Sequence, residues 1–303
     1  MSDLTLNDCL LPSTPKTPTA LKRASSSALQ LAALAVLLPL LCTSCADLSA
    51  VAKFAASAKS ASTGFSGIAS DFAGSAKRRA AYVSEEERPK VLNAAKAYKA
   101  QEADMLAAQK ILVAYVAALA AISTDSATSR DTSITSITNG SLVEAGVTAS
   151  EATAGAGLAK SVTDALSAGY RSNKAGKVIH DCNPQLQEYL KGLEHIVGTD
   201  YAGVLNSEQI SAEGYYNDLL RKYGEKEPLA AVEIIRQKQQ DLDAIAKKQT
   251  AAAAYVKVLT DIGEGHQKLY DAGQNMGTKH MLTILQPYME DIAVQSANVA
   301  AAY

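Results

Sequence analysis

The chain has 303 residues and a formal net charge of −2, with 29 Lys and Arg against 31 Asp and Glu. This balance excludes a basic footprint for nucleic acid. The sequence contains no Trp, only three Phe and much Ala, and its length suits one long domain or two small ones.

The first predicted element is an apolar run from Ala28 to Leu41, interrupted by Pro39. As a helix it would be only about 20 Å long, short of the roughly 30 Å hydrocarbon core of a membrane. A membrane-spanning helix is therefore disfavoured. The run is typical of the apolar part of a secretory signal peptide, and Lys16, Lys22 and Arg23 provide the positive region before it.

The run ends in Cys42-Thr43-Ser44-Cys45, which resembles the lipobox of bacterial lipoproteins. The resemblance implies that residues 1–44 form a signal peptide that is removed. It also implies that Cys45 is the lipid-anchored first residue of the mature chain, followed by one domain over residues 46–303. The family has an aliphatic residue, usually Leu, where this chain has Cys42. The alternative is an ordinary signal peptide, with Cys45 a plain thiol.

The residue after the lipobox cysteine bears on localisation. In Gram-negative lipoproteins an Asp at this position tends to retain the protein in the inner membrane, and this chain has Ala46. The resemblance therefore implies an outer-membrane lipoprotein with its body in the periplasm. Acyl chains contribute about 0.8 kcal/mol per buried methylene, so two or more chains on Cys45 would attach it stably to the membrane.

Residues 47–83 are predicted to form one helix with a narrow apolar seam. Two series of residues repeat every seven positions, namely Val51, Ala58, Phe65 and Phe72, and Phe54, Ala61 and Ile68. All three Phe lie on this seam, and we expect them to pack against other helices of the chain rather than to hold a ligand. Gly64, Gly67 and Gly74 lower helix propensity but permit close contact between helices.

The run Ser84-Glu85-Glu86-Glu87 has the spacing of a capping box and predicts a break. Pro89 suits the first turns of a second helix, which we expect to end near Ile122. Its last part, from Ile111, is apolar on all sides, but twelve residues are too few to span a bilayer and Lys110 precedes them. We therefore predict a central buried helix.

The next two stretches are rich in small and hydroxyl residues. For residues 123–139, helix, strand and loop all fit, and we choose a weak amphipathic helix on the spacing of Ile134, Ile137 and Leu142. Residues 149–179 are predicted to form one helix, with apolar residues four apart. Its Gly155 does not belong to a nucleotide-binding loop, because no strand precedes it and no Gly-Lys-Ser/Thr follows.

Three further helices are expected. Asn183-Pro184 predicts a helix start, with Asn at the N-cap and Pro at N1. Residues 198–200 predict a kink in this helix, which ends before a turn at 224–228. The others run from Leu229 towards Tyr270 and from Met281 to Ala302. The side chains expected to face inward are Leu186, Leu190, Leu193, Ile196 and Val197, then Val232, Ile235, Leu242 and Ile245, then Leu282, Leu285, Met289 and Ile292.

One pattern occurs twice: Ala-Tyr-Val-x-x-Leu-x-x-Ile at residues 114–122 and again at 254–262. It indicates either an old duplication of a helical hairpin or two helices that solve the same packing problem. We favour coincidence or convergence, because apolar spacings of three and four arise readily in Ala-rich helices.

No residues have the spacing of a catalytic or metal site. His180-Asp181-Cys182 are adjacent and cannot easily converge on one metal, and Glu264-x-His266 lacks a second His at helical spacing. Ser66 is not in a Gly-x-Ser-x-Gly elbow. Acidic runs such as Glu85–Glu87 are expected to be solvated helix ends. We predict no enzyme activity, no cofactor and no metal.

Beyond Cys45, the mature chain contains one cysteine, Cys182. If Cys45 is acylated, no internal disulfide is expected even in an oxidising compartment. A lone thiol there is either buried or available for an intermolecular bond, and we expect it to be buried.

Together these elements predict an all-α fold, an elongated bundle of long antiparallel helices with coiled-coil-like packing. We expect a membrane-anchored periplasmic protein that works by contact, as a scaffold or adaptor of the cell envelope, with a protein partner or further copies of itself. No small-molecule substrate is indicated. The alternative is a periplasmic inhibitor, such as an immunity protein that neutralises a toxin or enzyme, with Tyr215, Tyr216 and Tyr223 as its epitope.

Overall fold

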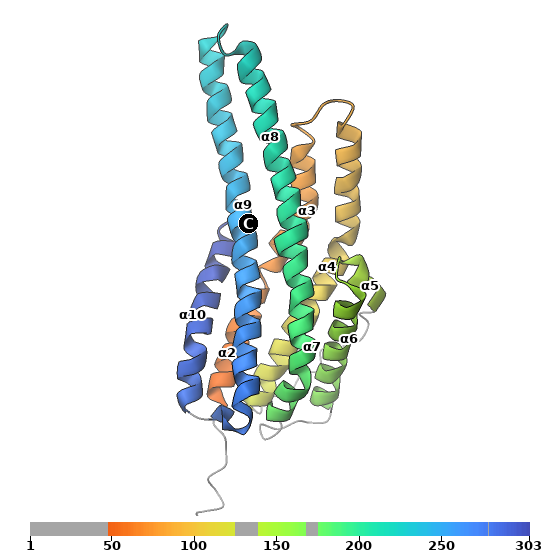
Figure 1. The fold of residues 1–303 in the computed structure, drawn as a ribbon, viewed down its shortest axis with the longest axis vertical. Coiled ribbons are helices and arrows are strands. Elements are labelled where there is room, and N and C mark those ends of the chain that lie inside the picture. Colours follow the sequence, from red (N-terminus) through yellow and green to blue (C-terminus); the bar gives the residue numbers. More distant parts are fainter. Residues whose placement is uncertain (1–47, 125–138, 168–174, 278) are drawn as a thin grey trace, which may run out of the picture. The chain divides into compact units, whose positions relative to one another are not determined.

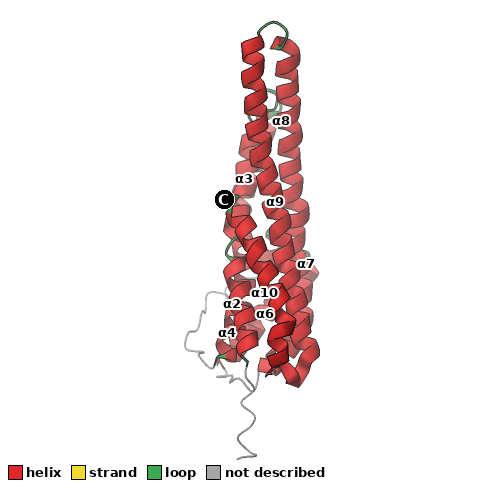
Figure 2. Ribbon diagram, turned by 90° about the vertical axis from the view of Figure 1, so that its left-hand side faces the viewer, coloured by secondary structure: helices red, strands yellow, loops and turns green. Residues whose placement is uncertain are grey.

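The computed structural model describes residues 48–124, 139–167, 175–277 and 279–303. Residues 46–303 make up one compact unit. Every regular element in the described ranges is a helix (Figures 1 and 2), so the prediction of an all-α protein is confirmed. The predicted signal peptide, Cys45 and most of the predicted helix at 123–139 lie outside the described residues.

The first predicted helix is two helices, α2 (Ser49–Ser62) and α3 (Phe65–Arg79), so the prediction of one helix over 47–83 is wrong. At the break, the side chains of Ser62 and Thr63 donate hydrogen bonds to backbone oxygens of the preceding turn, and Gly64 follows. Such local bonds compete with helix continuation. The seam itself is confirmed, because all seven of its residues are buried.

Helix α4 (Arg88–Ser123) begins and ends close to the predicted positions. The Ser84 hydroxyl accepts a hydrogen bond from the backbone N–H of Glu87 at 3.3 Å, as one half of a capping box does. Among the described residues α4 alone is long and apolar enough to cross a membrane, but 56% of its most apolar window is buried in the bundle. Residues 111–123 are all buried or half-buried, which confirms a buried helix.

The next helices are α5 (Asn139–Glu144), α6 (Ala149–Ser167) and α7 (Ala175–His195). The prediction of one helix over 149–179 is wrong, because α6 and α7 are separate helices that pack against each other. The intervening sequence contains Gly169, Ser172 and Asn173, residue types that favour turns.

Asn183-Pro184 lies inside α7, so the predicted helix start is also wrong. Its apolar face is continuous through this point, since Val178, Ile179 and Cys182 are buried like Leu186 further on. Burial of this face outweighs the helix-breaking effect of Pro184. The Asn183 side chain makes tertiary hydrogen bonds instead of capping the helix.

Helix α7 continues through a π-helical segment, η3 (Ile196–Tyr201), into α8 (Ala202–Tyr223). The predicted irregularity at 198–200 is thus a change of helix type. After the turn at 224–227 come α9 (Pro228–Ala272), the short 3₁₀ helix η4 (Gly273–Gly277) and α10 (Lys279–Ala300). Helices α8 and α9 form a long hairpin (Figure 1).

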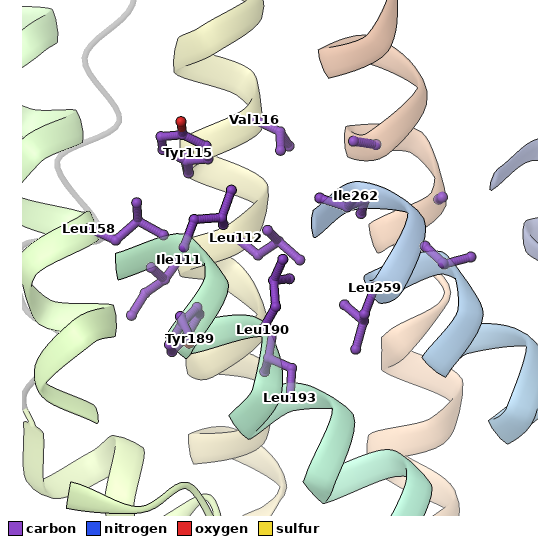
Figure 3. Close-up of a cluster of buried hydrophobic side chains, with 14 of the residues drawn as sticks. Ile111, Leu112, Tyr115, Val116, Leu158, Tyr189, Leu190, Leu193, Leu259 and Ile262 are labelled. Atoms are coloured by element: carbon purple, nitrogen blue, oxygen red, sulfur yellow. The ribbon is translucent and has the colours of Figure 1, made fainter. Parts of the chain in front are cut away.

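One part of the core lies between α4, α6, α7 and α9, as Figure 3 shows, and the core extends to buried residues of α2, α3 and α10. Its labelled members are Ile111, Leu112, Tyr115, Val116, Leu158, Tyr189, Leu190, Leu193, Leu259 and Ile262. Both tyrosines of the repeated motif are buried. The Tyr115 hydroxyl bonds to His266 on α9, and that of Tyr255 accepts from Gln109 on α4. Each copy of the motif thus places a hydroxyl against the helix that carries the other copy.

Two glycines allow α10 to approach α2 and α3. A Cβ on Gly64 would lie 2.9 Å from Val299, and one on Gly67 would lie 2.6 Å from the ring of Tyr303. The predicted role of these glycines is confirmed. Gly74 has a different role. A Cβ on Gly74 would lie 2.7 Å from the Asp71 side chain, so the glycine leaves room for the ion pair between Asp71 and Arg78 on the same helix.

Candidate functional site

The most polar part of the interior is a charge cluster that we define as Asp71, Arg78, Tyr201, Glu208 and Lys248. The Asp71 carboxylate accepts two hydrogen bonds from the Arg78 guanidinium (2.7 and 3.0 Å) and one from the Tyr201 hydroxyl (2.8 Å). The Lys248 ammonium lies 3.1 Å away. Glu208 accepts from Arg78 Nε at 2.6 Å. Arg78 therefore bridges two buried carboxylates, one on α3 and one on α8, and Lys248 provides the second positive charge of the cluster.

Further groups close the charge cluster. Ser75 donates to Glu208 at 2.6 Å. The hydroxyls of Tyr201 and Tyr303 are 2.6 Å apart, and the Tyr303 ring covers Lys248 at 4.5 Å from its centroid. Burial by itself raises the pKa of Asp71, but the hydrogen bonds from Arg78 and Tyr201 and the charge of Lys248 hold it below its ordinary value. An ionised, fully bonded carboxylate of this kind fixes helices rather than transferring protons.

A second polar group surrounds His266, which is buried on α9. Its Nδ1 lies 2.8 Å from Asn183 Oδ1, and its Nε2 lies 2.5 Å from the Tyr115 hydroxyl. Because Asn183 Oδ1 also accepts from Gln187, it is an acceptor, so Nδ1 carries the proton and Tyr115 donates to Nε2. Burial lowers the pKa of His266 to about 3. The imidazole is therefore neutral at physiological pH and poorly placed for acid–base chemistry there.

The remaining candidates lie apart. His180 is exposed and stacks on Tyr270, and His280 is exposed. Cys182 is buried, as predicted, and burial raises its pKa to about 11, which makes the thiolate scarce. Ser66 is exposed on α3. Across the described ranges no three His, Cys, Asp or Glu side chains gather to hold a metal. The absence of metal, cofactor and catalysis stays a prediction.

A hollow of about 310 Å³ lies beside the π-helical segment, between α3, α4 and α8. π-helical turns are frequent at functional sites. The charged side chains that line it are Arg79 and Asp200. Burial raises the pKa of Asp200, and His195 partly offsets this effect. Arg79 Nε donates to Ser211 at 3.0 Å, and no group in this hollow has the geometry of a catalytic site.

The surface feature that stands out is at the turn end of the α8–α9 hairpin, which extends beyond the ends of α3 and α4 (Figures 1 and 2). Three apolar side chains of α9, which we call the hairpin stripe, are exposed there: Leu229 (88%), Val232 (66%) and Ile235 (55%). They are three residues apart and share one face of the helix. Polar contacts of this end, such as Glu233 with Arg236 and Lys238 with Asn217, join residues of the hairpin itself.

The prediction that Val232 and Ile235 face inward is therefore wrong, whereas Ile245 further along α9 is buried as predicted. The physical reason is that the helices other than α8 end before the hairpin does, so nothing in the described chain covers the face of α9 that carries the stripe. The periodicity of the sequence predicts that these residues share an apolar face. It does not indicate at which residue of α9 the neighbouring helices end.

Of the three tyrosines proposed as an epitope, Tyr216 is buried, whereas Tyr215 and Tyr223 are exposed. Tyr216 is buried, and its hydroxyl and that of Tyr82 both donate to Asp241 Oδ2, at 2.5 and 2.8 Å. The rings of Tyr82, Tyr215 and Tyr216 touch, with centroids 5.3–6.0 Å apart. Tyr215 and Tyr223 are exposed, at 39% and 36%. The contacts of Tyr82 with Tyr215, Tyr216 and Asp241 tie the α3–α4 turn to the hairpin.

No family model matches the chain, and no curated protein or solved structure is similar to it.

Proposed function

We propose that the protein is a lipid-anchored scaffold or adaptor of the bacterial envelope without enzymatic activity. Acyl chains on Cys45 would hold it in the outer membrane, with the helical unit in the periplasm. The anchor rests on the resemblance of residues 42–45 to a lipobox. The observation that carries the interaction role is the exposed hairpin stripe, because contiguous apolar side chains on a surface typically mark a site of association.

The position of the stripe within the helical unit supports the proposal. Cys45 precedes Leu48 by three residues, which span about 10 Å of extended chain at most. Helix α2, which follows, contacts η4 at the far end of α9, where Phe54 packs against Gly265. The stripe is at the other end of α9, close to its first residue. An anchored chain would thus present the stripe away from the point of attachment.

Lipidation can be tested directly on the full chain. We expect a palmitate analogue to label the wild-type protein in the membrane fraction, and Cys45→Ala to abolish the label and give a soluble or uncleaved form. Cys42→Ala is the matched control and should stay labelled. If the label survives in Cys45→Ala but disappears in Cys42→Ala, the lipid-anchored residue is Cys42 and the assignment to Cys45 is wrong.

The interaction role predicts a complex. The full chain, extracted from membranes in mild detergent, should migrate on a native gel as a species larger than one chain. Val232→Asp should reduce it to a single chain, because a carboxylate buried in an apolar interface without a partner costs several kcal/mol. Val294→Asp on α10 is the matched control, since Val294 is 58% exposed. If Val232→Asp and Val294→Asp migrate equally, the hairpin stripe is not part of the interaction surface.

The inhibitor hypothesis has weaker support. An immunity protein needs an accessible epitope rich in charged or aromatic side chains. Tyr216, the middle member of the proposed epitope, is buried and bonded to Asp241. The hairpin stripe is aliphatic and favours helix packing over recognition of a polar toxin surface.

A further inference from the structure

We propose that Asp261 of α9 and Asp291 of α10 carry one negative charge between them, so that α10 is held on α9 more firmly at acidic than at alkaline pH. The two carboxylates lie beside a single ammonium group, that of Lys257, where the two helices pack together. This response to pH goes beyond the proposed function, because it depends neither on the lipid anchor nor on the hairpin stripe.

Lys257 can neutralise only one of the two carboxylates. Its Nζ lies 2.6 Å from Asp261 Oδ1, on the same helix, and 3.3 Å from Asp291 Oδ2. Two ionised carboxylates would leave this helix–helix interface with an excess negative charge. A neighbouring like charge disfavours ionisation, and two carboxylates that share a site therefore tend to retain a proton.

The surroundings of the two carboxylates assign the proton to Asp261. Its side chain is 2% exposed, and none of the described groups donates a hydrogen bond to its second oxygen, Oδ2. An ionised carboxylate with such a buried oxygen is unfavourable, whereas the protonated acid is itself a donor. The Asp291 carboxylate lies within hydrogen-bonding reach, is 38% exposed and accepts from Gln295 at 3.1 Å. Asp291 therefore keeps the charge.

The pKa shifts of the two groups have opposite directions, in agreement with this assignment. Burial raises the pKa of Asp261 above its ordinary value; Lys257 partly offsets this effect, and the charge of Asp291 adds to it. The hydrogen bond from Gln295 and the interaction with Lys257 hold the pKa of Asp291 below its ordinary value.

The charged residues of the surrounding elements are exposed or bonded to other groups. Lys53 and Lys59 of α2, Glu264 of α9 and Glu290 of α10 are exposed. On α7 and α8, Glu194 accepts a hydrogen bond from Thr260, and Glu208 pairs with Arg78. The charge balance at Asp261 is therefore set mainly by Lys257 and Asp291.

The sign of the response follows from the raised pKa. A group whose pKa is higher in the folded than in the unfolded chain stabilises the fold in acid, and this contribution is lost as the pH rises through the folded value. Loss of the proton places a second negative charge beneath α10, whose other contacts include Val299 on Gly64 and Tyr303 on Gly67. Alkaline pH should therefore weaken the packing of this helix.

Thermal unfolding of the purified full chain in neutral detergent micelles tests the response. Asp261→Asn mimics the protonated acid, so its Tm should exceed that of the wild type by about 2–4 °C at pH 8, and the difference should narrow as the pH falls to 5. Asp271→Asn removes an exposed carboxylate of the same helix and is the matched control. It should follow the wild type at each pH.

Two further measurements locate the effect. At pH 8 the amide hydrogens of α10 should exchange roughly tenfold faster in the wild type than in Asp261→Asn, and at pH 5 the rates should be nearly equal. Asp291→Asn leaves Lys257 to Asp261 alone. This variant should therefore gain less stability than the wild type on acidification from pH 8 to pH 5.

The opposite results would overturn the proposal. If Asp261→Asn becomes less stable than the wild type as the pH rises, or if the difference in Tm is constant with pH, Asp261 is ionised and paired with Lys257. Equal exchange of the α10 amides at pH 8 would exclude an effect on this helix. If Asp261→Asn does not fold, identical pH profiles of the wild type and Asp291→Asn would exclude the shared proton.

Discussion

Replacing Arg78 by Met is expected to lower the free energy of unfolding of residues 46–303 by about 3 kcal/mol at pH 7, because two buried carboxylates then lose the partly buried cation that is hydrogen-bonded to both. Here two carboxylates, Asp71 and Glu208, lose their shared guanidinium in one substitution. Met retains an aliphatic side chain of similar length, so the decrease in the free energy of unfolding measures mainly the loss of the positive charge and its hydrogen bonds. Denaturant unfolding measures it, and Lys77→Met, at the exposed neighbour, should stay within about 0.5 kcal/mol.

The pH dependence of this loss has a definite sign. In the wild type the pKa of Asp71 lies below its ordinary value, so its contribution is present above the unfolded pKa of about 4 and is lost as the pH falls below it. In Arg78→Met, Asp71 keeps only Lys248 as a counter-charge, and protons can neutralise the remaining negative charge of the cluster. The difference between wild type and variant should therefore narrow from pH 7 to pH 4. A constant difference, or a loss no greater than that of Lys77→Met, would contradict a charge-based role.

The second large effect is expected for Phe65→Ala, at about 3–5 kcal/mol, as for other buried aromatic residues. Phe65 is fully buried, and its ring centroid lies 5.6 Å from that of Tyr255. For a unit of this size, such a loss corresponds to a decrease of about 10 °C in Tm, measurable by circular dichroism.

Ser66→Ala, at the exposed neighbouring position, is the control for Phe65→Ala and should leave Tm nearly unchanged. The competing interpretation of the seam is a partner-binding stripe. Under that interpretation Phe65→Ala would keep its melting curve and lose association instead. That result would also be hard to reconcile with the burial of all three Phe inside the bundle.

The sequence predicted the helices well where apolar periodicity and burial coincide. Three predicted apolar faces are buried in the structure: the seam of α2 and α3, the apolar part of α4, and the face of α10 that carries Leu285 and Ile292. The errors are at breaks, where local signals compete. Asn183-Pro184 has the signature of a helix start, but a continuous buried face carries α7 through it. Ser62, Thr63 and Gly64 divide a seam whose heptad pattern is unbroken.

The polar features were largely missed because their partners are distant in sequence. Asp71, Ser75 and Arg78 are four and three residues apart, a spacing that does indicate one helix face. That they meet Glu208 and Lys248 follows only from the fold. The hairpin stripe was recognised as apolar but assigned to the core, since no pattern within α9 records where α10 ends. The lipid anchor at Cys45 stays a prediction.

The uninterrupted length of α9 sets a distance. From Val232 to Ala272 it rises about 60 Å at 1.5 Å per residue, without a proline in between. Helix α2, the first helix of the described chain, packs near the other end of this rod, so a protein bound at the hairpin stripe would be held at a fixed distance from α2. A flexible linker of the same length would let the distance between the two ends vary, whereas a continuous helix keeps that distance constant.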